Sequence, residues 1–138
     1  MYKIDKILIG THNKGKFREI SDLLPKKVEK ISPEELGIES PIENGKTFLQ
    51  NSELKANFFC SRSKLVTLSD DSGLEIDSLN GQPGIFSARW AEQYGSFDKA
   101  MSEILKKMKS SNKETSAQFV CSLSIQWPDG KRMSEIGT

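Results

Sequence analysis

The stretch LVTLSDDSGLEIDSL, residues 65–79, places two adjacent aspartates between two strand-like runs. The apolar run LVTLS is typical of a buried strand that ends at the acids, and LEIDSL alternates like a second strand. At the exit of a buried strand, Asp70 and Asp71 repel each other and each loses hydration. We therefore expect something beside the two carboxylates to compensate, whether a neighbouring lysine, a metal ion or only water.

The residues on either side of this stretch mix strands with amphipathic helices. Apolar residues at helical spacing predict a helix over Lys14–Leu24, and Pro25 stops it. The turn residues Asp129-Gly130 lie between two alternating runs and predict a β-hairpin. The other predicted elements are strands over Lys6–Ile9 and residues 28–31, helices over Thr47–Ser63 and Asp98–Met108, and a loop with one helical turn between residues 32 and 46. The fold class is therefore α/β or α+β.

The composition of the chain excludes some classes of function. The chain has 138 residues, which suits a single domain, and its 20 basic residues nearly balance its 19 acidic ones. This balance argues against nucleic-acid binding as the main function. No stretch resembles a signal peptide or a membrane-spanning helix. Cys60 and Cys121 are far apart and belong to no metal-binding pattern, so we expect reduced thiols and a cytoplasmic protein.

The segment GTHNKGKF, Gly10–Phe17, fits a strand–loop–helix turn and partly matches a phosphate-binding loop. Its first seven residues follow the pattern GxxxxGK, but Phe17 stands where that motif needs a hydroxyl for Mg²⁺. A degenerate P-loop NTPase is therefore one hypothesis. Backbone N–H groups at a helix start, together with Lys14 and Lys16, suit a polyphosphate under either hypothesis. Taken alone, the loop is more typical of an ordinary turn with solvated lysines.

Taken together, the acids predict metal-assisted phosphate chemistry. Mg²⁺ in proteins is held by one or two carboxylates, while phosphates and water complete its coordination. Asp70 and Asp71 offer such ligands at one strand end, and Glu43 lies in the loop before the next helix. Asn51 and Lys55 share one face of that helix. A lone acid pair would more often cap a turn and face solvent, so the prediction depends on this combination.

Four stretches together resemble the inosine/xanthosine triphosphate pyrophosphatase family. They are THNKGKFREI, ENGKTFLQNSELKA, DDSGLEIDSLNGQPGIFSAR and FVCSLSI, and they run in order from Thr11 to Ile125. The resemblance implies hydrolysis of deaminated purine nucleoside triphosphates (ITP, dITP and XTP) to the monophosphate and pyrophosphate. It also implies a homodimer and a mixed α/β fold. Its elongated mixed β-sheet would be flanked by helices in two lobes with a central cleft.

The resemblance also implies roles for individual residues. Asp71 would accept a proton and bind Mg²⁺ together with Glu43, and Asp70 would be an outer ligand or an orienting group. Arg89 would support the cleft or form a structural ion pair. The substrate-binding residues would be Thr11, His12, Asn13, Lys14, Gly15, Lys16, Lys55 and Ser72.

Two departures from the family pattern matter. Gln50 stands where the family usually has a glutamate, which removes one acid near the metal. The motifs by which the family reads the purine base do not occur in these 138 residues, so we expect a domain that is incomplete at its C-terminus. A third hypothesis follows from this, a catalytically idle nucleotide-binding or dimerisation module.

Overall fold

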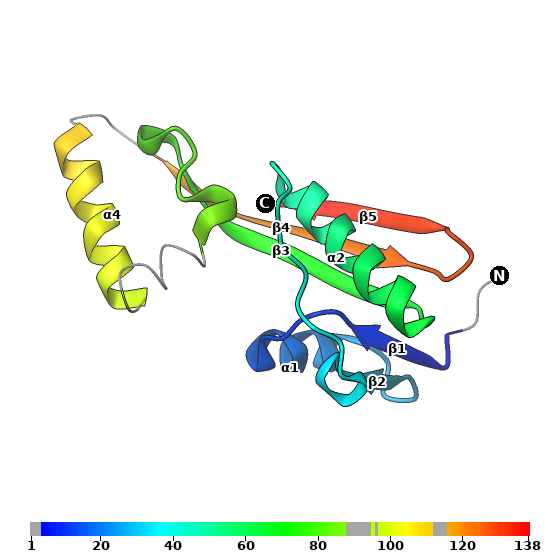
Figure 1. The fold of residues 1–138 in the computed structure, drawn as a ribbon. Coiled ribbons are helices and arrows are strands. Elements are labelled where there is room, and N and C mark those ends of the chain that lie inside the picture. The colour runs from blue at the N-terminus through cyan, green and yellow to red at the C-terminus, as the bar shows by residue number, and fades with distance from the viewer. Residues whose placement is uncertain (1–3, 88–94, 96, 112–115) are drawn as a thin grey trace. The chain divides into compact units, whose positions relative to one another are not determined.

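The computed structural model describes residues 4–87, 95, 97–111 and 116–138. Five strands form one sheet in the order β2-β1-β3-β4-β5 (Figure 1). Strand β1 pairs in parallel with β2 on one side and with β3 on the other. The strands are β1 (Lys6–Ile9), β2 (Glu29–Ile31), β3 (Thr67–Ile76), β4 (Ala117–Gln126) and β5 (Arg132–Gly137).

The helices agree closely with the sequence periodicity. Asn13 caps α1 and Thr47 caps α2, each by accepting a hydrogen bond from the backbone N–H three residues ahead. A short 3₁₀ turn, η1, provides the single helical turn expected between residues 32 and 46. The helices are α1 (Lys14–Leu23), α2 (Phe48–Ser63) and α4 (Phe97–Ser111), with 3₁₀ turns η1 (Glu34–Leu36), η2 (Asp77–Leu79) and η3 (Gly84–Phe86).

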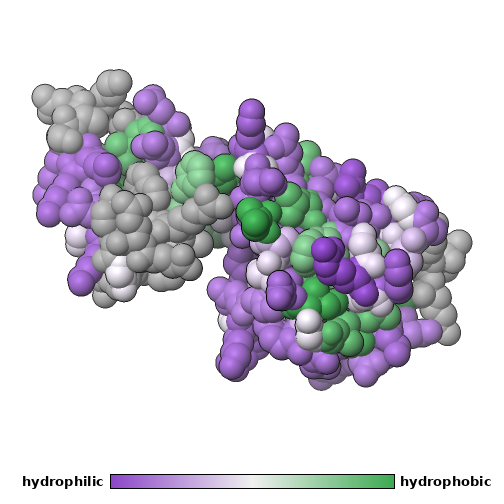
Figure 2. Space-filling model, viewed as in Figure 1, coloured by the Kyte–Doolittle hydropathy of each residue, from purple (hydrophilic) through white to green (hydrophobic). Residues whose placement is uncertain are grey.

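The chain divides into two compact units. The first contains Met1–Asp71 and Ser122–Glu135, and the second contains Ser72–Cys121 and Ile136–Thr138. In the part of the chain that the structure describes, no helix is long and apolar enough to cross a membrane. On the face drawn in Figure 2, hydrophobic areas are small patches in a mostly hydrophilic surface.

The first unit has an apolar core on the α1 face of its sheet. Its centre consists of Ile7, Val28 and Leu68, and α1 adds Ile20 and, just past its end, Leu24. Together with Phe17, these two residues form the apolar stripe that predicted the helix. The stripe therefore decides which face of α1 packs against the sheet. This packing holds the loop at the start of α1 next to the carboxyl end of β1.

The prediction that a strand ends at the acids is wrong, because β3 continues through both of them to Ile76. Successive side chains of a strand point to opposite faces. Leu68 packs into the α1 core, so Asp70 also faces α1, whereas Ser69 and Asp71 face α2. Alternation thus separates the two charges and gives each carboxylate its own partners, which is why the strand tolerates them.

Helix α2 covers the other face of the first unit with a mixture of apolar and polar side chains. Phe59 is fully buried, and a Cβ added to Gly10 would lie only 2.7 Å from its ring. Any other residue at position 10 would therefore collide with the helix. Deeper in the same face, the buried hydroxyls of Ser122 and Ser124 each lie 2.8 Å from the Ser52 hydroxyl. These contacts fix α2 against β4.

Candidate active site

Asp71 is the central carboxylate of the first unit. Its side chain lies at the α2 face of β3, and the residue is 9% exposed. The Asn51 amide nitrogen donates a hydrogen bond of 3.1 Å to Asp71 Oδ2. The other end of the same amide, Asn51 Oδ1, accepts a hydrogen bond of 2.8 Å from the backbone N–H of Gly45. Asn51 therefore connects the carboxylate to the loop that precedes α2.

The surroundings of Asp71 raise the pKa of its carboxyl group to about 6. Burial is the largest cause, because it disfavours the charged form. The hydrogen bond from Asn51 and the positive charge of Lys55 act in the opposite direction, and the negative charge of Glu43 adds to the increase. A carboxylate with such a pKa is a stronger base than an ordinary aspartate and is still mostly ionised at neutral pH.

Lys55 and Glu43 form an ion pair beside Asp71. Lys55 Nζ lies 3.4 Å from Glu43 Oε1, and Lys55 is 9% exposed although it carries a charge. The loop that carries Glu43 is held at two points, because Gln50 accepts a hydrogen bond of 2.7 Å from Lys46 N and Asn51 accepts the one from Gly45. Gln50 therefore braces this loop, a role for which its neutral side chain is sufficient.

Lys16 and Asp70 form a second ion pair on the α1 face of the sheet. Lys16 Nζ lies 3.0 Å from Asp70 Oδ2, and the Asp70 side chain is 7% exposed. The second oxygen, Asp70 Oδ1, is buried without a hydrogen-bond partner among the described residues. Two lysines, each held by a carboxylate, thus lie on either side of β3.

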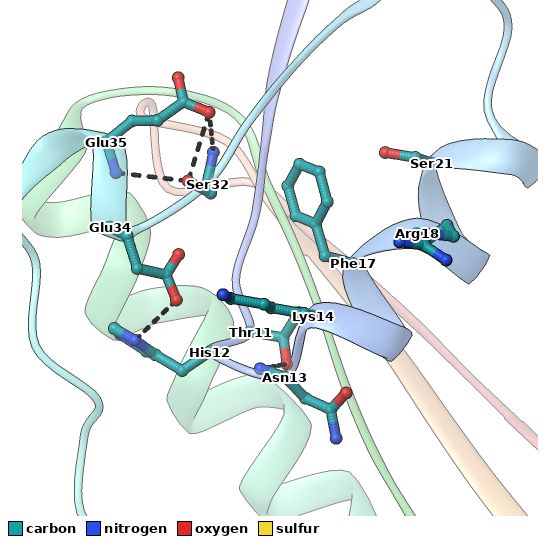
Figure 3. A pocket seen from close by; sticks show the side chains of 10 residues that line it. All are labelled: Thr11, His12, Asn13, Lys14, Phe17, Arg18, Ser21, Ser32, Glu34 and Glu35. Carbon is teal, nitrogen blue, oxygen red and sulfur yellow. Dashed lines mark hydrogen bonds and ion pairs between the residues drawn. The ribbon is translucent and has the colours of Figure 1, made fainter.

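The loop between β1 and α1 is stabilised by its own side chains. Thr11 Oγ1 accepts a hydrogen bond of 3.1 Å from Asn13 N, and Asn13 Oδ1 accepts one of 3.0 Å from Lys16 N. His12 Nδ1 lies 3.0 Å from Glu34 Oε1 of η1 (Figure 3). The backbone N–H of Lys16 is occupied by this cap, so the loop differs from the open N–H cradle of a P-loop.

The carboxylates of the first unit suit a hard divalent cation. Glu43 raises the pKa of Asp71, so the two charges are close enough to repel, and a cation between them would relieve this repulsion. The unpartnered oxygen of Asp70 lies on the opposite face of β3 and does not belong to this pair. No group of three or more metal-ligating side chains forms a closed site among the described residues. An open set of one or two carboxylates fits Mg²⁺, whose remaining ligands are phosphates and water.

The Thr11–Lys16 loop and Asp70 lie at a position of the sheet where other α/β folds bind ligands. From β1 the chain goes first to β2 on one side and then to β3 on the other. Ligands in open parallel sheets bind beyond the carboxyl ends of the strands at such a switch point. The Thr11–Lys16 loop follows the end of β1, and Asp70 lies on β3. The first unit therefore combines a ligand-binding position with acids and lysines.

The structure brings together only some of the residues singled out from the sequence. Lys16 pairs with Asp70, and Asp71 is electrostatically coupled to Lys55 and Glu43. Ser72 is the first residue of the second unit, and Arg89 lies outside the described residues. The site roles of Thr11, His12, Asn13, Lys14, Gly15, Lys16, Lys55, Ser72, Glu43 and Asp71 therefore stay predictions.

Asn51 was underestimated from the sequence. The sequence placed it on the helix face opposite the apolar residues, but it is 3% exposed and bonds both Asp71 and Gly45. Its shared helix face with Lys55, four residues later, was apparent from the sequence, but that spacing did not indicate a hydrogen bond to Asp71. Both polar side chains are buried together.

A comparison with protein families identifies the family of the chain. The model of the Ham1 family matches residues 7–137. The chain belongs to the Ham1 family. A dITP/XTP pyrophosphatase of Zymomonas mobilis is 44% identical over 128 residues, and one of Rhodospirillum centenum is 42% identical over 137 residues. The resemblance inferred from the sequence motifs is confirmed.

The chain spans only part of these Ham1 relatives. It covers 61% of the Zymomonas protein and 68% of the Rhodospirillum protein, which in turn match 91% and 97% of this chain.

Two solved Ham1 structures share the fold. A Ham1 protein from Coxiella burnetii superimposes with a TM-score of 0.86 at 27% identity, and one from Staphylococcus aureus with 0.83 at 32%. The chain covers 69% and 68% of those two chains, and 96% of it is matched in each. The predicted mixed α/β class is confirmed.

The raised pKa of Asp71 predicts that removing its charge stabilises the chain. The folded state holds the proton up to about pH 6, whereas the unfolded chain loses it near 3.8, so stability falls as pH rises between these values. Two pKa units correspond to roughly 3 kcal/mol, the upper bound of the effect. We expect Asp71→Asn to increase the free energy of unfolding by about 1–3 kcal/mol at pH 8, and by much less at pH 4.

Urea unfolding in metal-free buffer at both pH values measures this difference. Asp22→Asn is the matched control, because Asp22 is exposed on the same unit and its change should stay within about 0.5 kcal/mol. If Asp71→Asn were less stable than the parent chain at pH 8, the claim that the buried charge of Asp71 is destabilising would be wrong.

Proposed function

We propose that this chain provides the phosphate- and metal-binding part of a nucleoside triphosphate pyrophosphatase that hydrolyses ITP, dITP and XTP to the monophosphate and pyrophosphate. The observation that carries the proposal is the buried base Asp71, held by Asn51 and coupled to the Lys55–Glu43 pair. The names of the curated relatives support the choice of deaminated purine nucleotides as substrates.

The residues of the chain have distinct tasks in this reaction. Asp71 accepts the proton of the attacking water, for which its raised pKa suits it. Lys16 and Lys55 exchange their carboxylate partners for phosphate oxygens, so their charges are already in place before substrate binds. Glu43 and Asp71 would hold Mg²⁺, and Asp70 would orient Lys16 on the other face of β3. When bound, the ion neutralises phosphate charge and lowers the pKa of a water ligand.

The alternatives considered from the sequence receive less support. A P-loop NTPase needs free backbone N–H groups and a hydroxyl after its lysine, whereas here Asn13 occupies the N–H of Lys16 and Phe17 follows. The curated relatives are named as pyrophosphatases, which does not favour an idle module. A homodimer, Mg²⁺ as the cofactor, a cytoplasmic location, and the absence of nucleic-acid or membrane partners remain parts of the proposal.

Analysis of the products of ITP tests the proposed function directly. We expect inosine monophosphate and pyrophosphate in equal amounts, formed only when Mg²⁺ is present. Inosine diphosphate with orthophosphate would instead select the P-loop hypothesis. Binding of ITP and Mg²⁺ without any product would select the idle module, provided that a Ham1 relative of full length is active in the same assay.

A further inference from the structure

Three serine hydroxyls are buried together where α2 packs against β4. Ser52, Ser122 and Ser124 are each 0% exposed. Ser52 lies at the centre, because its Oγ atom is 2.8 Å from the Oγ atom of each of the other two. A buried hydroxyl adds little stability even when it is hydrogen-bonded, whereas apolar side chains at the same contact would gain from the hydrophobic effect. Hydrogen bonds are directional and apolar contacts are not, so this cluster specifies one position of the helix.

The hydrogen-bonding capacity of Ser52 is fully used. A hydroxyl has one proton and two lone pairs. Ser52 Oγ donates to Leu49 O at 3.0 Å, so its two lone pairs accept from Ser122 and Ser124. Ser52 is also the one hydrogen-bond partner of the Ser122 hydroxyl among the residues that the structure describes. Rotation of α2 about its axis, or a slide along β4, would therefore break at least one of these bonds.

The network continues outward from Ser124 to β5 at the edge of the sheet. Ser124 Oγ lies 2.8 Å from Ser134 Oγ, and Ser134 Oγ lies 3.2 Å from Glu53 Oε2, which also pairs with Arg132. The Glu53 carboxylate only accepts, so four hydroxyl protons serve five pairs of atoms. One pair is therefore always without a proton. It falls at the half-buried Ser134, where water can replace the missing bond, and not among the buried hydroxyls.

From this arrangement we infer that Ser52 is a positioning residue for the candidate active site. Ser52 directly follows Asn51 on α2, and the next turn carries Lys55. The Asn51 amide nitrogen reaches Asp71 Oδ2 at 3.1 Å, near the upper end of hydrogen-bond distances, so a shift of α2 by about half an ångström breaks this bond. Ser52 thus holds the helix where Asn51 meets the carboxylate. That this affects hydrolysis rests on the proposed function; the positioning itself does not.

Amide NMR of the metal-free chain tests the positioning without any substrate. Asn51 Oδ1 accepts the Gly45 N–H and its amide nitrogen donates to Asp71, so the signals of these groups report where α2 lies. We expect Ser52→Ala to shift the Asn51 side-chain signals and to speed hydrogen exchange of the Gly45 N–H about tenfold, which corresponds to the loss of one hydrogen bond. Ser134→Ala is the matched control and should change neither, because the inner hydroxyls keep all their bonds.

A double variant separates positioning from stability. Ser52→Ala leaves the buried Ser122 hydroxyl without its described partner and should lower the urea midpoint. Ser52→Ala/Ser122→Ala removes the stranded hydroxyl, so we expect part of the midpoint to return while the Asn51 signals stay shifted. The rate of ITP hydrolysis should be about tenfold below the parent in both variants, because misplaced catalytic groups lower the rate of a chain that is still folded. If Ser52→Ala does not fold, the double variant carries the same measurements.

Two results would contradict a positioning role of Ser52. The first is that the Asn51 and Gly45 signals of the folded variants are unchanged. The second is that these signals and the rate recover together with the urea midpoint in the double variant, because Ser52 would then act through stability alone. Signals that stay shifted in the double variant support the inference. If the parent chain forms no product from ITP while these signals respond as expected, the proposed function fails and the positioning by Ser52 stands.

Discussion

Under the proposed function, Asp71→Asn should lower the rate of ITP hydrolysis by about 10³-fold. General-base catalysis contributes roughly 10²–10⁴-fold, and an amide of nearly the same shape cannot accept the proton. The hydrogen bond from Asn51 can persist on the amide oxygen, so the site keeps its shape. Steady-state rates at saturating ITP and Mg²⁺ measure the effect, and far-UV circular dichroism confirms that the variant is folded.

The same substitution is expected to stabilise the chain at pH 8, so a rate loss cannot be explained by unfolding. Opposite changes in stability and activity are typical of an active-site group that is held in an unfavourable environment. Asp22→Asn provides the control, since it removes an exposed charge from the same unit and should leave the rate within about twofold. Turnover equal to the parent in Asp71→Asn would refute the assignment of Asp71 as the base.

Phe59→Ala should destabilise the chain by about 3–5 kcal/mol. Phe59 is fully buried between α2 and the sheet, and removal of a large core side chain loses both its transfer free energy and the packing around the cavity. The cavity would open directly beneath Gly10, where the ring and the Ser69 side chain now leave no room for a Cβ. Since domains of this size are stable by only about 5–15 kcal/mol, urea unfolding should show a large decrease in the midpoint.

Phe58→Ala is the matched control for this prediction. Phe58 is half-buried, meets the Phe59 ring edge-to-face at 5.4 Å, and lies under the Arg62 guanidinium at 3.5 Å. Both variants lose the same aromatic pair, and Phe58→Ala also loses the Arg62 contact, so any greater cost of Phe59→Ala comes from the burial of Phe59. We expect Phe58→Ala to cost about 1–2 kcal/mol, from the aromatic and cation–π contacts. Equal losses in the two variants would contradict the large contribution expected from the burial of Phe59.

The sequence by itself determined the local elements and predicted the chemistry of the site. The apolar stripe of Ile20 and Leu24 is set by residues within two turns of each other, so periodicity was sufficient to predict α1. The caps of Asn13 and Thr47 are local for the same reason. Acids next to a lysine-bearing loop indicated phosphate and metal chemistry from residue type alone. The order and spacing of four motifs indicated the family, which the comparison confirmed.

Only the tertiary structure decided which groups meet. Strand β3 can run through Asp70 and Asp71 because Lys16 and Asn51 provide their partners. These two residues lie on different helices, so no local pattern contains this information. Asn51 and Asp71 are 20 residues apart, so their hydrogen bond exists only after α2 packs on the sheet. The burial of Lys55 likewise arises only when α2 packs on the sheet and removes water from the lysine. Burial and long-range pairing arise from the whole fold, and they set the pKa of Asp71 on which the proposed chemistry depends.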